Sequence, residues 1–341
     1  MELDCLTSDQ EFDSLEREWN ALVERSASNM PFLRYEYLRT WWRTRGGGEW
    51  NDAALRLVTA REAGSLVGVA PFFRTQHDGR RAWVLLGSIE ISDYLDLIVA
   101  EGQEEKFSER LLDLASAQPD DELHLLDLYN LRAASRTLTT LPALAGTRGW
   151  RLETQELQPC PSIALPDNWE VFLERLDKKQ RHEVRRKLRR GEGDEEAIEW
   201  SIVGPQADIQ AEIDSFLALM REDERKAKFL SELMVQQFRL SLAAAHAAGW
   251  LQLAFLTVDG RRAAGYANFD YLNRIWVYNS GIAPRFAALS PGWILLARLI
   301  EWSIRHGREA FDFMRGNEGY KFQWGGVSQP IRRLRLIRPG A

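Results

Sequence analysis

Blocks of apolar residues with strand-like spacing follow amphipathic stretches along this chain, and the same order occurs twice. Residues 55–64 predict a strand and a tight turn, and residues 251–260 repeat this pattern after a shift of 196 residues. Each block has a glycine at its tenth position, Gly64 or Gly260, where a two-residue hairpin turn needs a positive φ. The chain therefore contains a weak internal repeat.

The elements around these two blocks also correspond. Two further strands are expected after each block, at 65–73 and 81–86 and again at 261–269 and 274–280. Helices are expected before them, at 10–25, 35–43, 208–222 and 231–248. A helix and a strand follow, at 104–117 and 122–128 and again at 291–306 and 309–315. The order α, α, β-β-β, α, β in each half predicts an α/β (α+β) protein whose mixed sheets are flanked by helices.

A proline-rich segment separates the two halves. Residues 158–166 contain three prolines, which interrupt helices and strand pairing. A length of 341 residues also fits two domains of ordinary size. We therefore predict an N-terminal domain over 1–157 and a C-terminal domain over 158–341.

Composition narrows the class of protein. The net charge of −6 argues against a general DNA or RNA binder. Cys5 and Cys160 lie far apart, and the five histidines are scattered, so neither a disulfide framework nor a metal site is expected. No apolar run is long enough to span a bilayer, and the acidic N-terminus does not resemble a secretory signal. These features predict a cytoplasmic protein.

The segment 311–324 is the strongest candidate for chemistry. It places Asp312, Arg315, Glu318 and Lys321 at a regular spacing of three, among four aromatic residues: Phe311, Phe313, Phe322 and Trp324. Buried charges are costly unless they are paired. The pattern therefore predicts either a functional site at the end of a strand or a structural ion-pair cluster that closes a loop.

The beginning of the expected helix at 291 is a second candidate. Ser290 is a good N-cap, Pro291 suits the first helical position, and Gly292 lets another group approach the backbone. Free N–H groups and the helix dipole attract phosphate at such an end. A strand through residues 278–281 leads into it. The alternative is a well-capped helix without a ligand.

A basic run is the third candidate. Residues 175–190 include nine basic and two acidic residues, and an acidic stretch follows at 192–196. Leu176, Val184 and Leu188 supply a narrow apolar stripe. Phosphate groups of a cofactor, an anionic lipid surface or an RNA backbone would be attracted to the bases. A solvated helix face is the alternative.

With these motifs the chain resembles the GNAT-like acetyltransferase family that is often attached to cellulose-biosynthesis proteins, a relative of the Fem aminoacyltransferases. The most specific part is 311–324, where the family has a strand ending in Asp-Phe-Leu-Arg-Gly, then an acidic residue and Tyr-Lys. Supporting parts are 290–292 with Leu295 and Leu296, Asp-Tyr-Leu-Asp at 93–96, and residues 169–173 before the basic run.

The resemblance implies two tandem GNAT-type domains and transfer of an acyl group from a CoA thioester to an amine. The C-terminal domain would carry the chemistry, and the N-terminal domain would be a degenerate copy that shapes the acceptor groove. Acetyl-CoA or another acyl-CoA would bind near 289–293, without a metal ion. A family histidine near the end of the helix at 208–222 is replaced by Met220, which Arg221 and Arg225 follow.

These expectations assign roles to individual residues. The expected catalytic residues are Asp312, Glu318 and Tyr320: a carboxylate would take the amine proton, and the tyrosine would protonate the leaving thiolate. The expected acceptor-binding residues are Arg315, Lys321, Arg225 and Trp324. The expected donor-binding residues are Tyr278, Asn279, Ser280, Ser290, Gly292 and Trp293. Backbone N–H groups near Tyr278–Ser280 would polarise the thioester carbonyl.

Two alternatives to a CoA-dependent enzyme acting on a small-molecule, glycan or peptide amine stay open. One is a Fem-like transferase that uses aminoacyl-tRNA to modify a cell-wall precursor. The basic run would then meet RNA, although it predicts a helix too short for a paired-helix arm, which makes tRNA the less favoured partner. The other is a catalytically silent scaffold in polysaccharide synthesis. Residues 175–190 also allow peripheral contact with a membrane.

Overall fold

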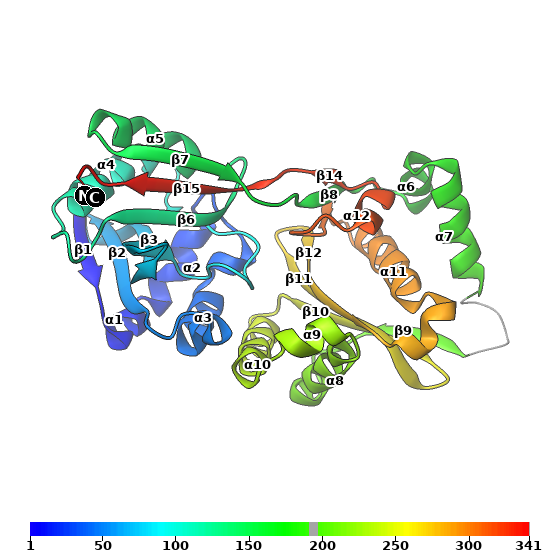
Figure 1. Cartoon of the computed structure of the whole chain (residues 1–341). Helices are drawn as coiled ribbons and strands as arrows, with labels where there is room; N and C mark the ends of the chain where they lie inside the picture. Colours follow the sequence, from blue (N-terminus) through cyan, green and yellow to red (C-terminus); the bar gives the residue numbers. More distant parts are fainter. Residues whose placement is uncertain (191–196, 341) are drawn as a thin grey trace. The chain divides into compact units, whose positions relative to one another are not determined.

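The computed structural model describes residues 1–190 and 197–340, and the acidic stretch at 192–196 lies outside the described residues (Figure 1). The chain forms two compact units. Unit 1 contains Met1–Gln158 and Pro330–Ala341, and unit 2 contains Pro159–Gln329. Each unit has one mixed sheet flanked by helices, so the predicted α/β fold class is confirmed.

Unit 1 is built on the sheet β1-β2-β3-β4-β6-β15-β7, and β5 pairs with β3 beside it. Its strands are β1 (Glu2–Leu6), β2 (Ala54–Glu62), β3 (Ser65–His77), β4 (Arg80–Leu85), β5 (Ile98–Val99), β6 (Leu125–Arg132), β7 (Arg151–Glu156) and β15 (Ile331–Ile337). Its helices are α1 (Asp9–Ser14), α2 (Glu16–Glu24), η1 (Pro31–Leu33), α3 (Tyr35–Gly48), α4 (Glu104–Ser116) and α5 (Thr137–Thr147). The helix expected over 10–25 is thus two helices, which meet at Leu15.

Unit 2 is built on the sheet β14-β8-β13-β12-β11-β10-β9. Its strands are β8 (Pro161–Ala164), β9 (Ile198–Ile202), β10 (Leu251–Val258), β11 (Arg261–Tyr271), β12 (Arg274–Ile282), β13 (Ala310–Asp312) and β14 (Val327–Ser328). Its helices are α6 (Trp169–Arg175), α7 (Lys178–Arg190), α8 (Ile209–Arg221), α9 (Glu224–Phe229), α10 (Glu232–Ala247), η2 (Pro284–Leu289), α11 (Pro291–Arg305) and α12 (Gly319–Gln323).

The hairpin turns of the internal repeat have the same conformation in both units. Ala63 and Gly64 join β2 to β3 with φ of 49° and 81°, and Asp259 and Gly260 join β10 to β11 with φ of 49° and 72°. Two successive left-handed residues define the hairpin turn whose twist matches that of the flanking strands. The glycine at the tenth position of each block therefore has the role that its spacing predicted.

The core of unit 2 positions its helices on the sheet. A large cluster of buried side chains joins α6, α7 and α11 to one face, and the stripe of Val184 and Leu188 holds the basic helix α7 there. Helices α8 and α10 pack on the other face (Figure 1). Gly281 permits the close approach of α8, since a Cβ atom at Gly281 would lie 2.7 Å from the backbone nitrogen of Met220.

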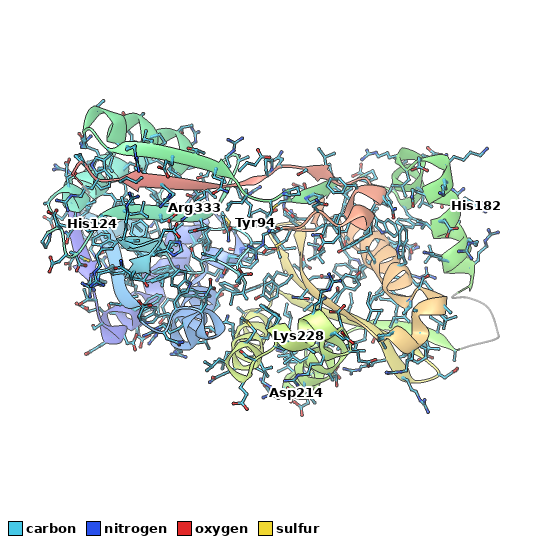
Figure 2. All side chains as sticks on the ribbon, in the orientation of Figure 1. Tyr94, His124, His182, Asp214, Lys228 and Arg333 are labelled. Carbon is cyan, nitrogen blue, oxygen red and sulfur yellow. The ribbon has the colours of Figure 1, made fainter. Side chains whose placement is uncertain are left out.

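The end of the chain returns to unit 1, whereas the predicted boundary placed it with the second domain. Strand β15 pairs with β6 on one side and with β7 on the other. Arg333, labelled in Figure 2, donates from Nε to Asp127 at 2.8 Å, and its Nη2 lies 2.9 Å from an Asp78 oxygen. The carboxylate of Asp127 is fully buried, so this pair fixes the returning strand.

Removing the charge of Asp127 should destabilise unit 1. Asp127→Asn leaves the guanidinium of Arg333 partly uncompensated in a buried setting, so we expect the free energy of unfolding to fall by about 3 kcal/mol. Asp78→Asn is the matched control, because the Asp78 side chain is 47% exposed and solvent screens its pairing. Urea denaturation followed by circular dichroism measures both. Equal and small losses in the two variants would contradict this account.

Candidate functional site

Strands β12 and β13 separate after a short parallel pairing. Arg274–Trp276 pair with Ala310–Asp312, where β13 ends, while β12 continues to Ile282. Just beyond the pairing β12 has a bulge: Val277 lies opposite Asn268 and Asn279 opposite Ala267, which leaves Tyr278 as the extra residue. Bulges bend a strand and leave backbone groups unpaired. The distal part of β12 thus borders an opening in the sheet.

A cavity of about 350 Å³ lies at this end of β12. It is lined by Tyr266, Ser280, Ile282, Ala287, Ser290, Pro291, Gly292, Trp293, Leu296 and Tyr320. Its volume falls in the range of small-molecule sites, and its lining is mainly apolar with a few hydroxyl groups. Four of the six predicted donor-binding residues (Ser280, Ser290, Gly292 and Trp293) therefore meet in one cavity with Tyr320, a predicted catalytic residue.

The beginning of α11 differs in detail from the sequence prediction. Ser290 occupies the predicted N-cap position of α11, but it has left-handed backbone angles (φ 56°, ψ 49°) and its side chain caps no N–H group of the helix. Its carbonyl oxygen accepts instead from the backbone N–H groups of Trp293 and Ile294. Gly292 leaves room for the Ile282 side chain, because a Cβ atom at Gly292 would lie 2.5 Å from Cδ1 of Ile282.

Tyr320 brings a hydroxyl group into the cavity from α12. Its ring packs edge-on against Phe313, and the described residues offer its hydroxyl no hydrogen-bond partner. Burial raises the pKa of Tyr320 well above its usual value, with a smaller contribution from the charge of Glu318. The phenol therefore stays protonated and can donate a hydrogen bond to a ligand.

Glu318 and Lys321 form the tight part of the predicted charge cluster. Lys321 is almost fully buried, and its ammonium donates to the Arg315 carbonyl oxygen at 2.6 Å and to Glu318 Oε2 at 2.9 Å. Burial acts to raise the pKa of Glu318, but the hydrogen bond and charge of Lys321 lower it below its usual range. Lys321 thus holds the loop closed, whereas Glu318 is 59% exposed and can meet a ligand.

Asp312 lies apart from this pair. Its carboxylate is 2% exposed, accepts from the backbone N–H of Met314 at 2.8 Å and lies 3.3 Å from Nη1 of Arg274. It does not line the cavity. Asp127 occupies the corresponding last paired position of β6 in unit 1 and also pairs with an arginine. This geometry favours a structural role for Asp312 over proton transfer.

The remaining predicted residues are placed as follows. Trp324 is fully buried, with its ring 4.9 Å from that of Trp293, so it belongs to the core and cannot contact an acceptor as predicted. Arg225 is exposed on α9, and Arg315 is partly buried in the loop after β13. The ring of Tyr278 stacks on Phe269, and Tyr278 does not line the cavity.

Sequence reasoning missed Lys226, the neighbour of Arg225 on α9. Its ammonium donates to Asn279 Oδ1 at 3.1 Å and to the carbonyl oxygen of Ser280. Asn279 Oδ1 also accepts from the backbone N–H of Ser280 at 2.9 Å, so this predicted N–H donor is already engaged. No sequence pattern separates Lys226 from the other basic residues of α9. Its contacts with Asn279 and Ser280 of β12 are visible only in the structure.

The corresponding opening of unit 1 is filled by the chain itself. Strands β4 and β6 pair in parallel only over Ala82–Val84 and Leu125–Asp127, and the loop at 87–96 lies beyond them. The side-chain amide of Asn130 donates to the carbonyl oxygens of Ile89 and Ser92. Asn130 thus holds the loop in place, and a degenerate role for unit 1 stays a prediction.

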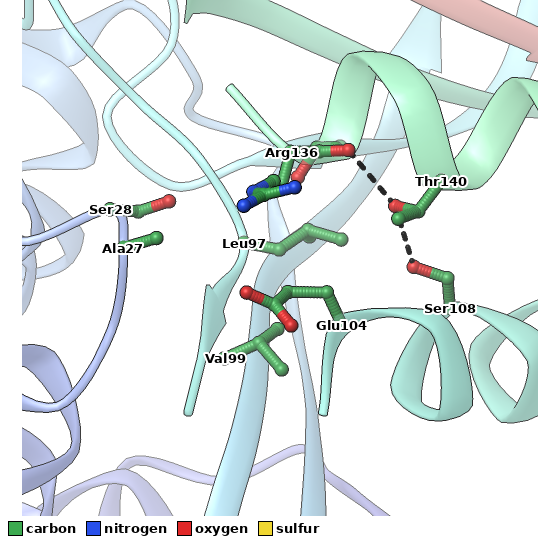
Figure 3. A pocket seen from close by; sticks show the side chains of 9 residues that line it. Ala27, Ser28, Leu97, Val99, Glu104, Ser108, Arg136 and Thr140 are labelled. Atoms are coloured by element: carbon green, nitrogen blue, oxygen red, sulfur yellow. Dashed lines mark hydrogen bonds between the residues drawn. The ribbon is translucent and has the colours of Figure 1, made fainter. Parts of the chain in front are cut away.

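The acidic motif at 93–96 serves packing in unit 1. Asp96 is buried and accepts from Ser28 at 2.8 Å and Thr137 at 2.5 Å. Burial raises the pKa of Asp96, and these hydroxyl groups oppose the shift. The neighbouring cavity of Figure 3, lined among others by Arg136 and Thr140, holds only about 10 Å³, less than a ligand needs.

One group of potential metal ligands occurs among the described residues. Ligand atoms of His77, Asp78 and Asp127 lie within 4.8 Å of one another. Nη2 of Arg333 already contacts all three side chains, at 3.4 Å from the histidine. The guanidinium occupies the position that a metal ion would take, so the group serves as an ion-pair network.

The basic helix α7 lies beside the cavity. Lys187 places its ammonium 4.2 Å above the ring of Trp293, and desolvation lowers its pKa. Arg185 and Arg186 pair with acidic residues, whereas the described residues offer no ion-pair partner to Lys178, Lys179 and Arg181. The face of α7 that carries these three bases is thus available to an anion.

Comparison with known proteins agrees with this geometry. Residues 178–322 match the family model described as the acetyltransferase (GNAT) domain. Unit 2, with its separated parallel strands and the cavity between β12 and α11, therefore has a GNAT-like acyltransferase fold. The chain carries a GNAT-type acetyltransferase domain. No curated protein matches the chain.

Solved structures resemble the whole chain in fold. FemX has a TM-score of 0.67 at 13% identity, over 99% of this chain and 97% of that one. The C-terminal domain of a putative lysylphosphatidylglycerol synthetase from Agrobacterium fabrum has a TM-score of 0.60 at 12% identity, over 97% and 93%. L-PGS from Bacillus licheniformis has a TM-score of 0.56 at 14% identity, over 98% and 93%. In the described part of this chain, no helix is long and apolar enough to cross a membrane.

Proposed function

We propose that the protein is an N-acyltransferase that moves an acyl group from an activated donor to an amine, with acetyl-CoA or another acyl-CoA as the donor. The cavity at the end of β12 carries this proposal, because it joins the bulged strand, the beginning of α11 and a buried tyrosine hydroxyl. Unit 2 holds all of these groups. The cytoplasmic location and the cellulose-associated subtype stay predictions.

The cavity suits the acyl and thioester part of such a donor. Ile282, Leu296 and the ring of Trp293 offer apolar surface to an acyl chain, and the Tyr320 hydroxyl offers a hydrogen bond. Lys187 lies over the ring of Trp293. Together with Lys178, Lys179 and Arg181 of α7, it would attract the phosphate groups of CoA. Because residue 292 is a glycine, no side chain covers the first turn of α11 at this position.

The chemistry requires a neutral amine and a stabilised leaving group. The amine nitrogen forms a bond to the acyl carbon, the carbon–sulfur bond breaks, and the departing thiolate needs a proton. Because its pKa is raised, Tyr320 is a poor proton donor but a good hydrogen-bond donor to the leaving sulfur. Exposed and ionised, Glu318 would attract the cationic acceptor to the same loop.

Donor binding can be tested by calorimetry with acetyl-CoA and free CoA. We expect wild-type protein to bind both and Ile282→Trp to bind at least tenfold more weakly, because a large side chain at this position narrows the cavity. Leu233→Trp is the control, because Leu233 is 45% exposed on α10 and does not line the cavity. If the wild-type protein binds neither compound, the CoA-dependent reaction is ruled out and a catalytically silent scaffold is favoured.

An aminoacyl ester on RNA is the second candidate donor. The unpaired bases of α7 and the likeness in fold to FemX favour it. The test measures tRNA binding in the same buffer as acetyl-CoA binding. If tRNA binds with an affinity that falls steeply with salt and acetyl-CoA does not bind, the donor is an aminoacyl ester on RNA and not a thioester. The proposed acyl transfer to an amine would be retained.

A further inference from the structure

We infer that Tyr266 is a donor-binding residue, whose hydroxyl group recognises an oxygen atom that the acyl donor carries into the cavity. This role rests on the proposed acyltransferase function and adds the chemistry that the donor must present. Tyr266 lies in the middle of β11, directly opposite Ser280 of β12. No sequence motif singled it out, because tyrosine is a common residue in strands.

The side chain of Tyr266 reaches the cavity from the sheet. Side chains of successive strand residues point to opposite faces. Gly265 faces α8, where a Cβ atom would lie 3.2 Å from Cδ2 of Phe216. Tyr266 therefore extends toward α11, and its hydroxyl lies 3.5 Å from the carbonyl oxygen of Gly292 in the first turn of that helix. Only 4% exposed, Tyr266 forms the wall of the cavity on the side of the sheet.

The hydroxyl group of Tyr266 lacks a well-formed hydrogen bond with the described residues. Hydrogen bonds between a hydroxyl group and an oxygen atom are roughly 2.5–3.0 Å long. The contact of 3.5 Å with Gly292 is therefore weak, and the described part of the chain offers no closer acceptor. A buried hydroxyl group that is left unpaired costs free energy. A molecule that fills the cavity and displaces water from it must thus supply an acceptor to Tyr266.

Tyr37 on α3 shows the contacts of a structural tyrosine in this protein. Tyr37 is fully buried, its hydroxyl donates to the carbonyl oxygen of Ile91 at 2.8 Å, and it lies 3.0 Å from Oγ of Ser92. The chain itself thus satisfies the hydroxyl group of Tyr37. Tyr266 is nearly as buried as Tyr37 but differs from it in the partners of its hydroxyl group.

A second hydroxyl group, that of Tyr320, enters the same cavity from α12. Burial raises the pKa of Tyr266, and the nearby Tyr320 adds to this shift. Both side chains are therefore protonated phenols, and each can donate one hydrogen bond. Because Tyr320 is assigned to the leaving sulfur, Tyr266 is available to an oxygen atom near the thioester.

The cavity has room for more than an acetyl group. If each heavy atom takes the roughly 30 Å³ of a water molecule, the three heavy atoms of an acetyl group fill about 90 Å³ of a cavity of 350 Å³. The remaining space suits a longer acyl chain or the adjoining arm of CoA, which contains amide groups. The partner of Tyr266 is then a hydroxyl or oxo oxygen of the acyl chain, or an amide carbonyl oxygen of the carrier.

The substitution Tyr266→Phe removes the hydroxyl group and keeps the ring. Calorimetry with free CoA, butyryl-CoA and β-hydroxybutyryl-CoA locates the partner, because all three contain the carrier and only the last has a further oxygen on its acyl chain. If the carrier supplies the oxygen, Tyr266→Phe should bind all three roughly tenfold more weakly than wild type. If the acyl chain supplies it, this loss should appear with β-hydroxybutyryl-CoA alone. Unchanged affinity for all three compounds would overturn the inference.

Tyr37→Phe is the matched control, and thermal stability gives a second measurement. Tyr37→Phe loses a structural hydrogen bond, so its melting temperature should fall by roughly 2–4 °C while its affinity for the donor stays at the wild-type value. Tyr266→Phe should melt at the wild-type temperature, because no well-formed bond within the protein is lost. A fall as large as that of Tyr37→Phe would show that the hydroxyl group of Tyr266 is structural and would contradict its role in binding.

The same titrations distinguish a failure of this role from a failure of the proposed function. If the wild-type protein and Tyr266→Phe bind the CoA compounds equally well, the proposed function stands and Tyr266 has no part in donor recognition. If the wild-type protein binds none of the compounds, the CoA-dependent function fails, and the role of Tyr266 fails with it.

Discussion

Tyr320→Phe is expected to lower kcat roughly 100-fold while the affinity for acetyl-CoA stays within about twofold. The substitution removes one hydroxyl group from the cavity and keeps the ring that packs on Phe313. A hydrogen bond to the leaving sulfur is needed most in the transition state, when negative charge develops there. The loss should therefore appear in kcat. Steady-state kinetics and calorimetry measure the two quantities.

Tyr271→Phe is the matched control for this variant. Tyr271 ends β11, and its ring lies 6.3 Å from that of Trp250, away from the cavity lining. It should keep the wild-type kcat. Full activity in Tyr320→Phe would contradict the role assigned to the hydroxyl group. A cooperative thermal transition in both variants would show that a loss of activity does not come from a loss of folding.

Gly281→Ala is expected to lower the free energy of unfolding by about 3 kcal/mol, because overpacking against fixed backbone cannot be relieved by a rotamer change. An added Cβ would lie 2.7 Å from the Met220 backbone nitrogen and 2.8 Å from the Leu219 carbonyl carbon. Helix α8 or strand β12 must then move. Since β12 borders the cavity, acetyl-CoA binding should weaken as well.

Gly204→Ala provides the comparison for Gly281→Ala. A Cβ atom at Gly204 would meet no atom within 4 Å, and its φ is not in the left-handed region. This variant should unfold at nearly the wild-type urea concentration. Similar urea midpoints for the two alanine variants would mean that α8 and β12 have room for a side chain at Gly281.

The sequence was informative where local chemistry determines the backbone. The two glycines of the repeated hairpins were identified because their turns need left-handed residues, and the structure has them there. The apolar stripe of α7 indicated which of its faces is buried. The sequence also singled out residues 290–293 and Tyr320, which line one cavity, and their roles stay predictions.

The roles of charged residues were harder to predict because sequence spacing does not define their partners. The regular spacing of Asp312, Arg315, Glu318 and Lys321 suggested one cluster. In the structure Asp312 meets Arg274, a residue of the neighbouring strand, whereas Glu318 and Lys321 pair with each other. Trp324 was predicted to bind an acceptor, but it is buried in the core, where its ring stacks on Phe172.

The sequence by itself determined the duplicated order of elements, the hairpin turns and the location of a basic helix, because these depend on periodicity, glycine and charge within short segments. Only the tertiary structure decided that β15 completes the sheet of unit 1 and that Lys226 reaches Asn279 and Ser280. Both depend on contacts between residues far apart in the chain. Such contacts are selected by the packing of whole elements, which no local pattern specifies.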